Sequence, residues 1–368
     1  MTVFLTRIKS KAPYLITAAV LLLAVAAAAT VIWLLKSSNE NTELKQTEPT
    51  VQTGFLMDTY IRQTTYDSSP DAGEKLRQLF DFLSEFENKA SMYLSDSEIS
   101  NINSHSGVMP VKVSDDIFQL LSRSKELCLQ SEGRFDITIG ALTKLWGITT
   151  DSPKVPSEEE IKDAQKLVDI NQLVLDAENK TAKLNAPYMS LDLGGVAKGY
   201  ACDLAREKYK ELGLTSCLLS LGGNIYSFGT KADGTAFVIG LRDPLGDADD
   251  IFGTVTAPDE VISTTGGYER YFEQDGKRYH HVLDPKTGYP AGSDLLSVTI
   301  IAEEGLLADC LSTSLFVGGK EAVLKNLSQT DFDVIAVDQE KNIYLSDGIR
   351  SRFQLSEGST YRLADSTE

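Results

Sequence analysis

Cysteine is scarce in this sequence and never closely paired. The four cysteines, Cys128, Cys202, Cys217 and Cys310, form no C-x-x-C motif. This absence excludes a zinc ribbon and a thioredoxin-type redox site, because both need closely spaced cysteine pairs. Each cysteine neighbours apolar residues, which favours buried free thiols. Two disulfides remain the alternative if the chain folds in an oxidising compartment.

Basic residues are also few, with 35 lysines and arginines against 53 aspartates and glutamates in 368 residues, a net charge of −18. No basic cluster stands out, so nucleic-acid binding is excluded, since it depends on cations that displace counterions from the phosphates. The motif G-x-x-x-x-G-K-[ST] is missing, which excludes a P-loop. Without internal repeats or proline-rich tracts, the length suits one large domain or two small ones.

One long uncharged run covers residues 12–35 and follows the basic residues Arg7, Lys9 and Lys11. It is long enough to cross a bilayer core of ~30 Å as a helix of roughly 20 residues. Its positive flank comes first, which predicts that the remainder lies outside the cytoplasm. We therefore expect residues 1–36 to form a cytoplasmic tip and a single transmembrane helix that anchors the protein in the cell membrane.

A cleaved secretory signal is the alternative interpretation of this run. The anchor is favoured because the run is longer than a typical signal core and because Trp33 stands at the expected interface. Residues 37–53 are polar and aperiodic, as in a tether. We expect a folded domain over residues 54–360 and a polar tail over residues 361–368.

The folded region mixes helical and strand patterns without regular alternation. Apolar residues at helical spacing predict helices over 72–86, 115–131, 196–212, 310–316 and 320–327. Segment 55–66 has the composition of a strand, and segment 216–229 that of a buried strand with a Gly-Gly turn. Hairpins are predicted over 173–184, 272–283 and 333–346. This arrangement indicates an α+β fold of mixed sheets with packed helices.

A glycine-rich segment, SLDLGGVAKGYACD at residues 190–203, predicts a strand, a tight turn and a helix start. Such a turn presents backbone N–H groups and a helix N-terminus to an anion, and Lys198 adds a positive charge. Asp192 comes just before the turn. An ordinary tight turn with a surface lysine explains this segment equally well when it is taken alone.

The segment TTGGYERYFEQDGKRYHHVLDPKTGYP contains two of the three histidines, His280 and His281. The Asp275-Gly276 pair predicts a hairpin turn between two strands. Adjacent strand residues face opposite sides, so one of the two histidines at most points into a site. A histidine there suits a general base. For a lone histidine, a structural role bonded to the backbone is the stronger alternative.

Hard oxygen ligands appear in EEGLLADCLSTSLFVGG, where Asp309 and Thr313 lie four residues apart and share one face of a helix. A carboxylate with a hydroxyl and backbone carbonyls suits Mg²⁺, although spacing alone fits a simple polar pair better. In EGRFDITIGALTKLWG, Phe135 is placed to stack on a ring and Asp136 to accept a hydrogen bond. Alone, that segment would be a core strand or a helix start.

Taken in order, these segments resemble the ApbE family of FAD:protein FMN transferases. The likeness runs from about Gly54 to Gly319 and includes SMYLSDSEISNIN and the Gly-Gly turn of SLGGNIYSFG. Several motifs in register make the resemblance specific. It implies an ApbE-like, T-fold-related α+β domain. Met57-Asp58-Thr59 stands where the family usually has Met-Gly-Thr, and Thr-Thr-Gly-Gly replaces the commoner Thr-Ser-Gly-Asp.

The resemblance assigns roles to twelve residues. FAD, as bound substrate, would contact Met57, Tyr93, Arg134, Phe135, Asp136, Asp192, Lys198 and Leu283. A cofactor Mg²⁺ would be held by the Gly195 carbonyl and by the side-chain oxygens of Asp309 and Thr313. The catalytic residues would be His281, as general base, and Asp309.

The resemblance also implies an activity: Mg²⁺-dependent transfer of FMN from FAD to a Thr or Ser hydroxyl of an acceptor flavoprotein, with release of AMP. Such protein flavinylation is a post-translational modification, and acceptors belong to membrane or surface electron-transfer chains. The alternatives are an FAD pyrophosphatase that releases FMN and AMP, or a flavin-binding carrier without catalysis. The aromatic side chain of Tyr93 resembles the residue that transferase members of the family have at this position, whereas members that only hydrolyse FAD can carry a different residue.

Overall fold

The computed structural model describes residue 30 and residues 48–231 and 233–364. The chain divides into two compact units, residues 1–47 and 48–368, and the fold below belongs to the second. The expected membrane anchor, apart from residue 30, and most of the expected tether lie outside the described residues. Within the part that is described, no helix is both long and apolar enough to span a bilayer.

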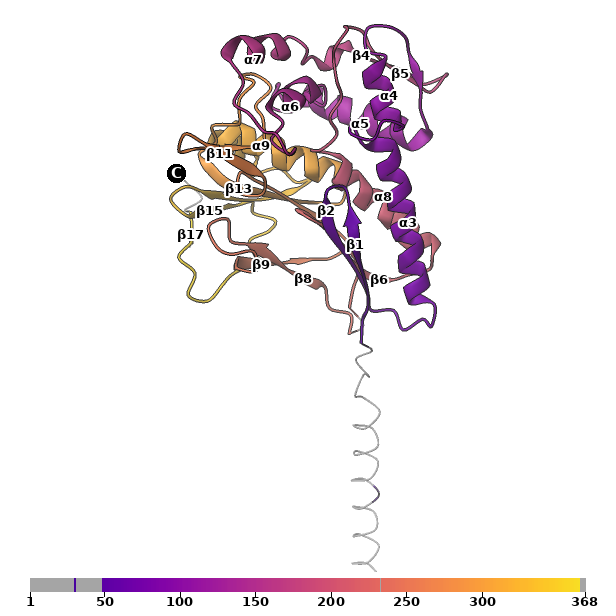
Figure 1. Ribbon diagram of the computed structural model, residues 1–368. Coiled ribbons are helices and arrows are strands. Elements are labelled where there is room, and N and C mark those ends of the chain that lie inside the picture. Colours follow the sequence, from indigo (N-terminus) through magenta and orange to yellow (C-terminus); the bar gives the residue numbers. More distant parts are fainter. Residues whose placement is uncertain (1–29, 31–47, 232, 365–368) are drawn as a thin grey trace, which may run out of the picture. The chain divides into compact units, whose positions relative to one another are not determined.

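A nine-stranded sheet forms the centre of the domain (Figure 1). Its neighbours are antiparallel except for the last pair. In spatial order the strands are β1 (Thr50–Leu56), β2 (Thr59–Thr65), β6 (Ser216–Leu221), β7 (Asn224–Gly229), β10 (Val261–Gly266), β13 (Leu295–Ala302), β14 (Asp333–Asp338), β15 (Asn342–Leu345) and β17 (Arg362–Leu363).

The first hairpin corrects the expectation of one continuous strand over residues 55–66. Strands β1 and β2 are joined by the two-residue turn Met57-Asp58, whose φ angles of 52° and 55° are both positive. Two positive φ angles define a type I′ turn, which prefers Asn-Gly, Asp-Gly or Gly-Gly, so Met57-Asp58 carries no hairpin signal. Because β1 begins at Thr50, the fold also starts inside the expected tether.

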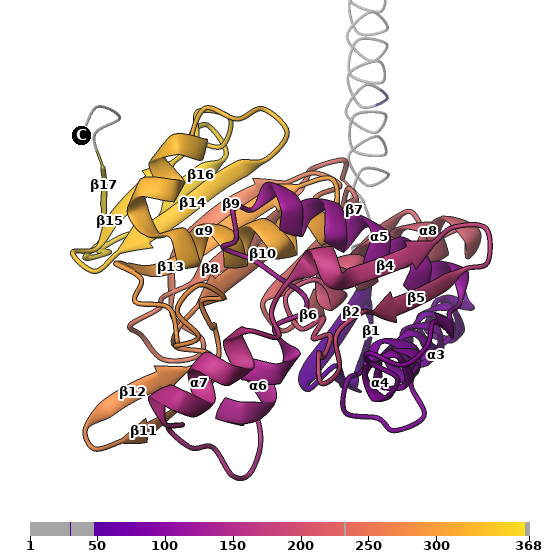
Figure 2. The same ribbon diagram turned by 90° about the horizontal axis from the view of Figure 1, so that it is seen from above.

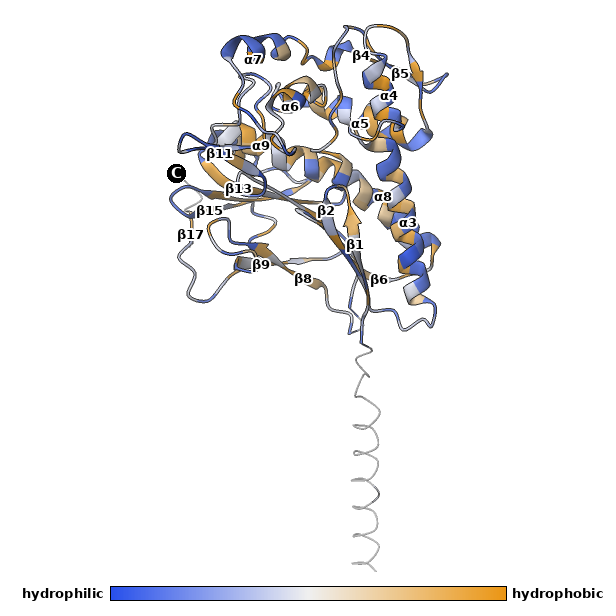
Figure 3. Cartoon of the chain, viewed as in Figure 1, coloured by the Kyte–Doolittle hydropathy of each residue, from blue (hydrophilic) through white to orange (hydrophobic). Residues whose placement is uncertain are grey.

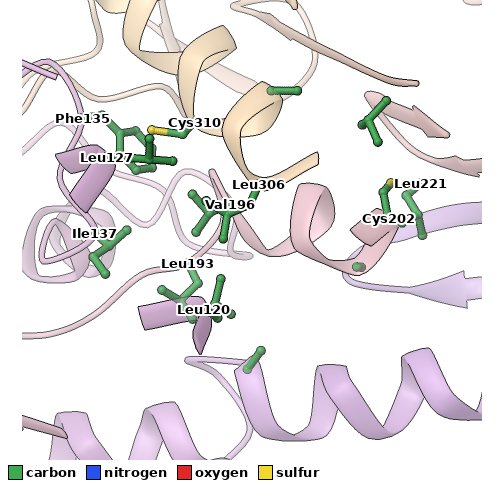
Figure 4. Packing of buried hydrophobic residues seen from close by; sticks show 14 of the residues in the cluster. Leu120, Leu127, Phe135, Ile137, Leu193, Val196, Cys202, Leu221, Leu306 and Cys310 are labelled. Atoms are coloured by element: carbon green, nitrogen blue, oxygen red, sulfur yellow. The ribbon is translucent and has the colours of Figure 1, made fainter. Parts of the chain in front are cut away.

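Three long helices cover one face of the sheet, namely α3 (Ala72–Ala90), α8 (Ala197–Glu211) and α9 (Gly305–Asn326). The core lies where they meet α5 (Asp115–Gln130). Figure 4 shows Leu127, Phe135 and Cys310 gathered together, with Val196 close to Leu306. Helix α9 is interrupted at Gly319, whose φ is 67°, which matches the expectation of two successive helices.

The opposite face of the sheet packs on a small sheet of β16 (Phe353–Leu355), β9 (Ile251–Ala257) and β8 (Phe237–Arg242). Tyr361 is buried in this second core, with 4% of its surface exposed. The expected polar tail over residues 361–368 is therefore wrong at its start, because the fold continues through β17.

A third apolar cluster joins α6 (Gly140–Trp146) and α7 (Glu158–Gln165) to the hairpin of β11 (Tyr271–Gln274) and β12 (Lys277–His280). Figure 2 shows this hairpin beside both helices, and Figure 3 shows that α7 consists mostly of hydrophilic residues. The indole of Trp146 is fully buried and donates to the Gly288 carbonyl at 2.8 Å. The cluster therefore fixes the chain on both sides of His281.

The remaining elements are α4 (Glu98–Ser104), the 3₁₀ turn η1 (Ile170–Gln172), and a small sheet of β3 (Val111–Lys112), β5 (Thr181–Leu184) and β4 (Leu173–Asp176). The three predicted hairpins and the predicted long helices are present, and the predicted strand with a Gly-Gly turn at 216–229 forms the hairpin of β6 and β7. All four cysteines are buried free thiols, as the sequence favoured.

Candidate active site

A cavity of about 540 Å³ is lined by segments that are far apart in the sequence. Its walls come from the β1–β2 turn, the loops after α3 and α6, the β6–β7 turn, strand β10 and the starts of α8 and α9. All twelve residues singled out from the sequence line it: Met57, Tyr93, Arg134, Phe135, Asp136, Asp192, Gly195, Lys198, His281, Leu283, Asp309 and Thr313. Segments distant in sequence are thus brought to one place.

Asp309 is buried at the base of the cavity, with 4% of its surface exposed. One carboxylate oxygen accepts from the Gly199 N–H at 2.9 Å, and the other accepts from the Ser263 hydroxyl at 3.1 Å. These bonds fix the orientation of the carboxylate. Each oxygen keeps a lone pair for a further partner, since a carboxylate has about four acceptor positions.

The Thr313 hydroxyl lies beside Gly195 and Thr265. A Cβ placed on Gly195 would come within 3.6 Å of the Thr313 hydroxyl and 2.7 Å of the Phe135 ring, so a larger residue there would have to displace that ring. The Thr265 and Thr313 hydroxyl oxygens are 3.2 Å apart. The chain segments that carry Gly195, Thr265 and Thr313 therefore meet at one wall of the cavity.

This donor set fits Mg²⁺. Among the described residues, no group of three or more His, Cys, Asp and Glu side chains forms a metal cage. Mg²⁺ does not need one, because it binds through one or two carboxylates and completes its octahedral shell with waters and substrate phosphate. Asp309, Thr313 and the backbone at Gly195 supply hard oxygens of that kind.

His281 follows strand β12 and lines the cavity. The backbone N–H of His281 donates to the Arg270 carbonyl at 3.0 Å, and the ring Nδ1 of His281 lies 3.2 Å from the same oxygen. A carbonyl is an acceptor only, so Nδ1 carries the proton and Nε2 is free to accept one. Burial, with the nearby charge of Lys198, lowers the pKa of His281 to about 4, which keeps the imidazole neutral.

His280 does not line the cavity. Its Nε2 donates to the Ala291 carbonyl at 3.1 Å, and its ring makes an edge contact with Phe316 at 5.8 Å between centroids. Consecutive strand residues point to opposite sides, which explains why the two histidines differ. His280 is thus a structural residue of the hairpin.

Lys198 and Asp192 frame the glycine turn before α8. The Lys198 ammonium donates to the Gly194 carbonyl at 3.2 Å and lines the cavity. Asp192 accepts from the Gly194 N–H at 2.8 Å and from the Thr143 hydroxyl at 2.7 Å. The turn is therefore rigid, and it presents a lysine and the start of a helix to an anion.

Asp136 uses much of its hydrogen-bonding capacity within the protein. Its carboxylate accepts from the N–H and hydroxyl of Thr138, at 2.8 and 2.7 Å, and from the Ile170 N–H at 3.0 Å. Burial raises the pKa of this carboxyl, against those three bonds. Asp136 therefore bonds mainly to the protein and holds the cavity wall in place. The neighbouring Arg134 also lines the cavity, and its buried Nε has no hydrogen-bond partner.

Tyr93 lies at the cavity mouth with 54% of its surface exposed. Its hydroxyl is 3.2 Å from the Thr149 hydroxyl, so the loops after α3 and α6 meet across the opening. Desolvation raises the pKa of this phenol, which keeps it a neutral hydrogen-bonding group. An exposed aromatic ring at a mouth is suited to stacking on a planar ligand.

The sequence did not single out three further cavity residues. Asn224 is 1% exposed and its amide nitrogen has no partner, so a buried donor is available to a ligand. Arg270 donates to the Asp58 carbonyl at 2.6 Å, and Glu87 accepts from the Met57 N–H at 2.9 Å. The Gly-Gly before Asn224 was the one available signal; the other contacts arise from tertiary packing.

Fold and cavity together define an α+β domain whose cavity gathers a lysine, a buried histidine, an aspartate and a threonine hydroxyl. A sequence model described as "ApbE family" matches residues 57–336. The chain belongs to the ApbE family.

Named relatives agree with this membership. The chain is 36% identical over 291 residues to an FAD:protein FMN transferase of Klebsiella pneumoniae (strain 342), covering 79% of this chain and 90% of the relative. It is 34% identical to one of Treponema pallidum (strain Nichols), covering 82% and 88%. Among solved structures, the flavin transferase ApbE from Vibrio cholerae superposes with a TM-score of 0.75 at 27% identity, covering 83% and 99%.

Proposed function

We propose that this protein transfers FMN from FAD to a Ser or Thr hydroxyl of an acceptor flavoprotein and releases AMP. The single observation that carries the proposal is the convergence of Lys198, His281, Asp309 and Thr313 on one cavity. The names of the relatives support the donor and the class of acceptor. The chemistry requires a nucleophile, a proton acceptor and neutralisation of a diphosphate, and the cavity offers a group for each.

His281 would act as the general base. Its Nε2 takes the proton from the acceptor hydroxyl, whose oxygen forms a bond to the phosphorus of the FMN phosphate. The bond from that phosphorus to the bridging oxygen breaks, and AMP leaves with the bridging oxygen. The Arg270 carbonyl keeps the required tautomer throughout, because it accepts the Nδ1 proton.

The leaving group and the diphosphate need positive charge. Lys198 and the N-terminus of α8 supply it from the protein, and Arg134 and Asn224 offer unpaired buried donors. Mg²⁺ at Asp309, Thr313 and the Gly195 carbonyl would supply Lewis-acid neutralisation of the phosphate oxygens.

Incubation of residues 48–368 with FAD, Mg²⁺ and an acceptor domain that carries an Asp-Gly-x-Thr segment tests the proposal. In-gel flavin fluorescence on the acceptor after denaturation, with stoichiometric AMP, is the expected result. AMP with free FMN would indicate an FAD pyrophosphatase, and neither product would indicate a carrier. Replacing Asp309 by Ala should abolish Mg²⁺-dependent transfer; full activity in that variant would remove the metal assignment.

The proposal includes a location. The basic residues before the uncharged run at 12–35 support a single-pass anchor with the catalytic domain outside the cytoplasm. Acceptors would then be flavoproteins of membrane or surface electron-transfer chains. Protease treatment of intact cells, followed by detection of the domain, is the test; a fully protected domain in cells whose surface proteins are cleaved would contradict it.

A further inference from the structure

Helices α8 and α9 cross with backbone-to-backbone contact. A Cβ on Gly199 would lie 2.1 Å from the Gly305 carbonyl oxygen, and a Cβ on Gly305 would lie 2.3 Å from the Gly199 carbonyl oxygen. No side chain fits at either position. The crossing therefore brings the first turns of the two helices together.

Neither helix caps its own N-terminus. The residues preceding them, Val196 and Glu304, make no side-chain capping bond. Glu304 is instead held by Arg123, whose guanidinium donates to both carboxylate oxygens at 2.7 Å. The first N–H groups of each helix need a partner from elsewhere, because they have none within the helix.

Each helix receives that partner from the other. Asp309 of α9 accepts from the Gly199 N–H of α8 at 2.9 Å. Asp203 of α8 accepts from the N–H groups of Gly305 and Leu306 of α9, at 2.6 and 2.9 Å. In both helices the carboxylate follows the contact glycine by four residues, which is about one turn. Asp203 caps the first two N–H groups of α9, and Asp309 caps the third N–H group of α8. A carboxylate at a helix N-terminus also stabilises the helix dipole.

Asp309 lines the cavity, whereas Asp203 does not. We propose that Asp203 is a positioning residue, whose cap on α9 holds Asp309 and Thr313 in register with Gly195 at the metal and diphosphate site. This inference rests on the proposed function for the identity of the ligand. Losing the Asp203 cap would let the first turn of α9 move relative to α8, and the donor oxygens would separate.

Asp203→Asn and Asp203→Ala are the test variants, because Asn keeps one of the two acceptor oxygens and Ala keeps none. Asp67→Asn is the matched control. Asp67 also accepts two backbone N–H bonds across elements, from Thr215 at 2.8 Å and Ser216 at 3.1 Å, but it lies outside the cavity. It should therefore share any loss of thermal stability without sharing a loss of metal binding.

Three measurements apply to each folded variant: Mn²⁺ binding in the presence of ADP by electron paramagnetic resonance, the Mg²⁺ concentration for half-maximal FMN transfer, and hydrogen exchange of the Gly305 and Leu306 amides. We expect Asp203→Asn to weaken Mn²⁺ binding roughly tenfold, which corresponds to about 1.4 kcal/mol. Asp203→Ala should weaken it further. The half-maximal Mg²⁺ concentration should rise in parallel, with faster exchange at both amides.

Metal binding by Asp203→Asn equal to that of Asp67→Asn would overturn the inference while leaving the proposed function intact. If the wild-type protein transfers no FMN but the graded loss of Mn²⁺ binding is seen, the proposed function fails and the role of Asp203 stands. Unchanged exchange of the two α9 amides in Asp203→Ala would show that the cap does not hold this turn, and would also overturn the inference.

Discussion

At the scale of single residues, the proposed general base His281 is the group whose protonation state controls the proposed reaction. Burial and the charge of Lys198 hold its pKa at about 4, well below the ordinary value for histidine. A general base must be unprotonated, so activity is lost as pH falls through its pKa and is retained above it. The low value extends activity into acid solution.

We predict that kcat/KM for FAD has its acid limb close to pH 4 rather than near 6.5. Replacing Lys198 by Met removes a positive charge that disfavours the imidazolium, so the limb should move to higher pH while the plateau falls. The pH profile of kcat/KM, with an NMR titration of the imidazole, gives both quantities. A limb at the same pH in the two proteins would contradict the electrostatic explanation.

At the scale of elements, Arg270 links the β1–β2 turn to the histidine. Its guanidinium donates to the Asp58 carbonyl at 2.6 Å, while its own carbonyl accepts from His281. Glu87 holds the other residue of the turn through the Met57 N–H. The turn is therefore clamped over the cavity from α3 on one side and from the β11–β12 hairpin on the other.

Replacing Arg270 by Ala removes the guanidinium and keeps the carbonyl. A charged hydrogen bond contributes about 1.5–3 kcal/mol, so we expect FAD affinity to fall by roughly tenfold or more. Quenching of flavin fluorescence measures this affinity. Arg278→Ala is the control, since that side chain lies on the same hairpin over the Tyr271 ring, outside the cavity. Equal losses in both variants would argue against a specific clamp.

The sequence predicted those elements of the fold and the site that have a local pattern, and missed those that depend on contacts between distant segments. The Asp275-Gly276 hairpin and the Asp309 and Thr313 helix carry local signals in spacing and turn composition. The Met57-Asp58 turn carries none, since its positive φ angles are imposed by strand pairing and by contacts with distant side chains. The Asp203 cap likewise joins two helices about a hundred residues apart, so no local pattern reports it.

At the scale of the whole molecule, the site exists only when the entire domain is folded, because its lining runs from Met57 to Thr313. Ligands that bind the folded state alone stabilise it by mass action. We predict that FAD with Mg²⁺ at a hundred times its dissociation constant adds about 2.7 kcal/mol to the free energy of unfolding. Differential scanning calorimetry measures this. In Asp309→Ala the Mg²⁺-dependent part of the gain should vanish; an unchanged gain would place the metal elsewhere.

The burial of the thiols has a practical consequence. Cys128, Cys202, Cys217 and Cys310 are each 3% exposed or less and lie on α5, α8, β6 and α9. Only a deprotonated, accessible sulfur reacts with an alkylating reagent. Each cysteine therefore reacts only after the helix or strand that carries it has opened. The order in which the four cysteine peptides are alkylated during slow denaturation would show which part of the protein opens first.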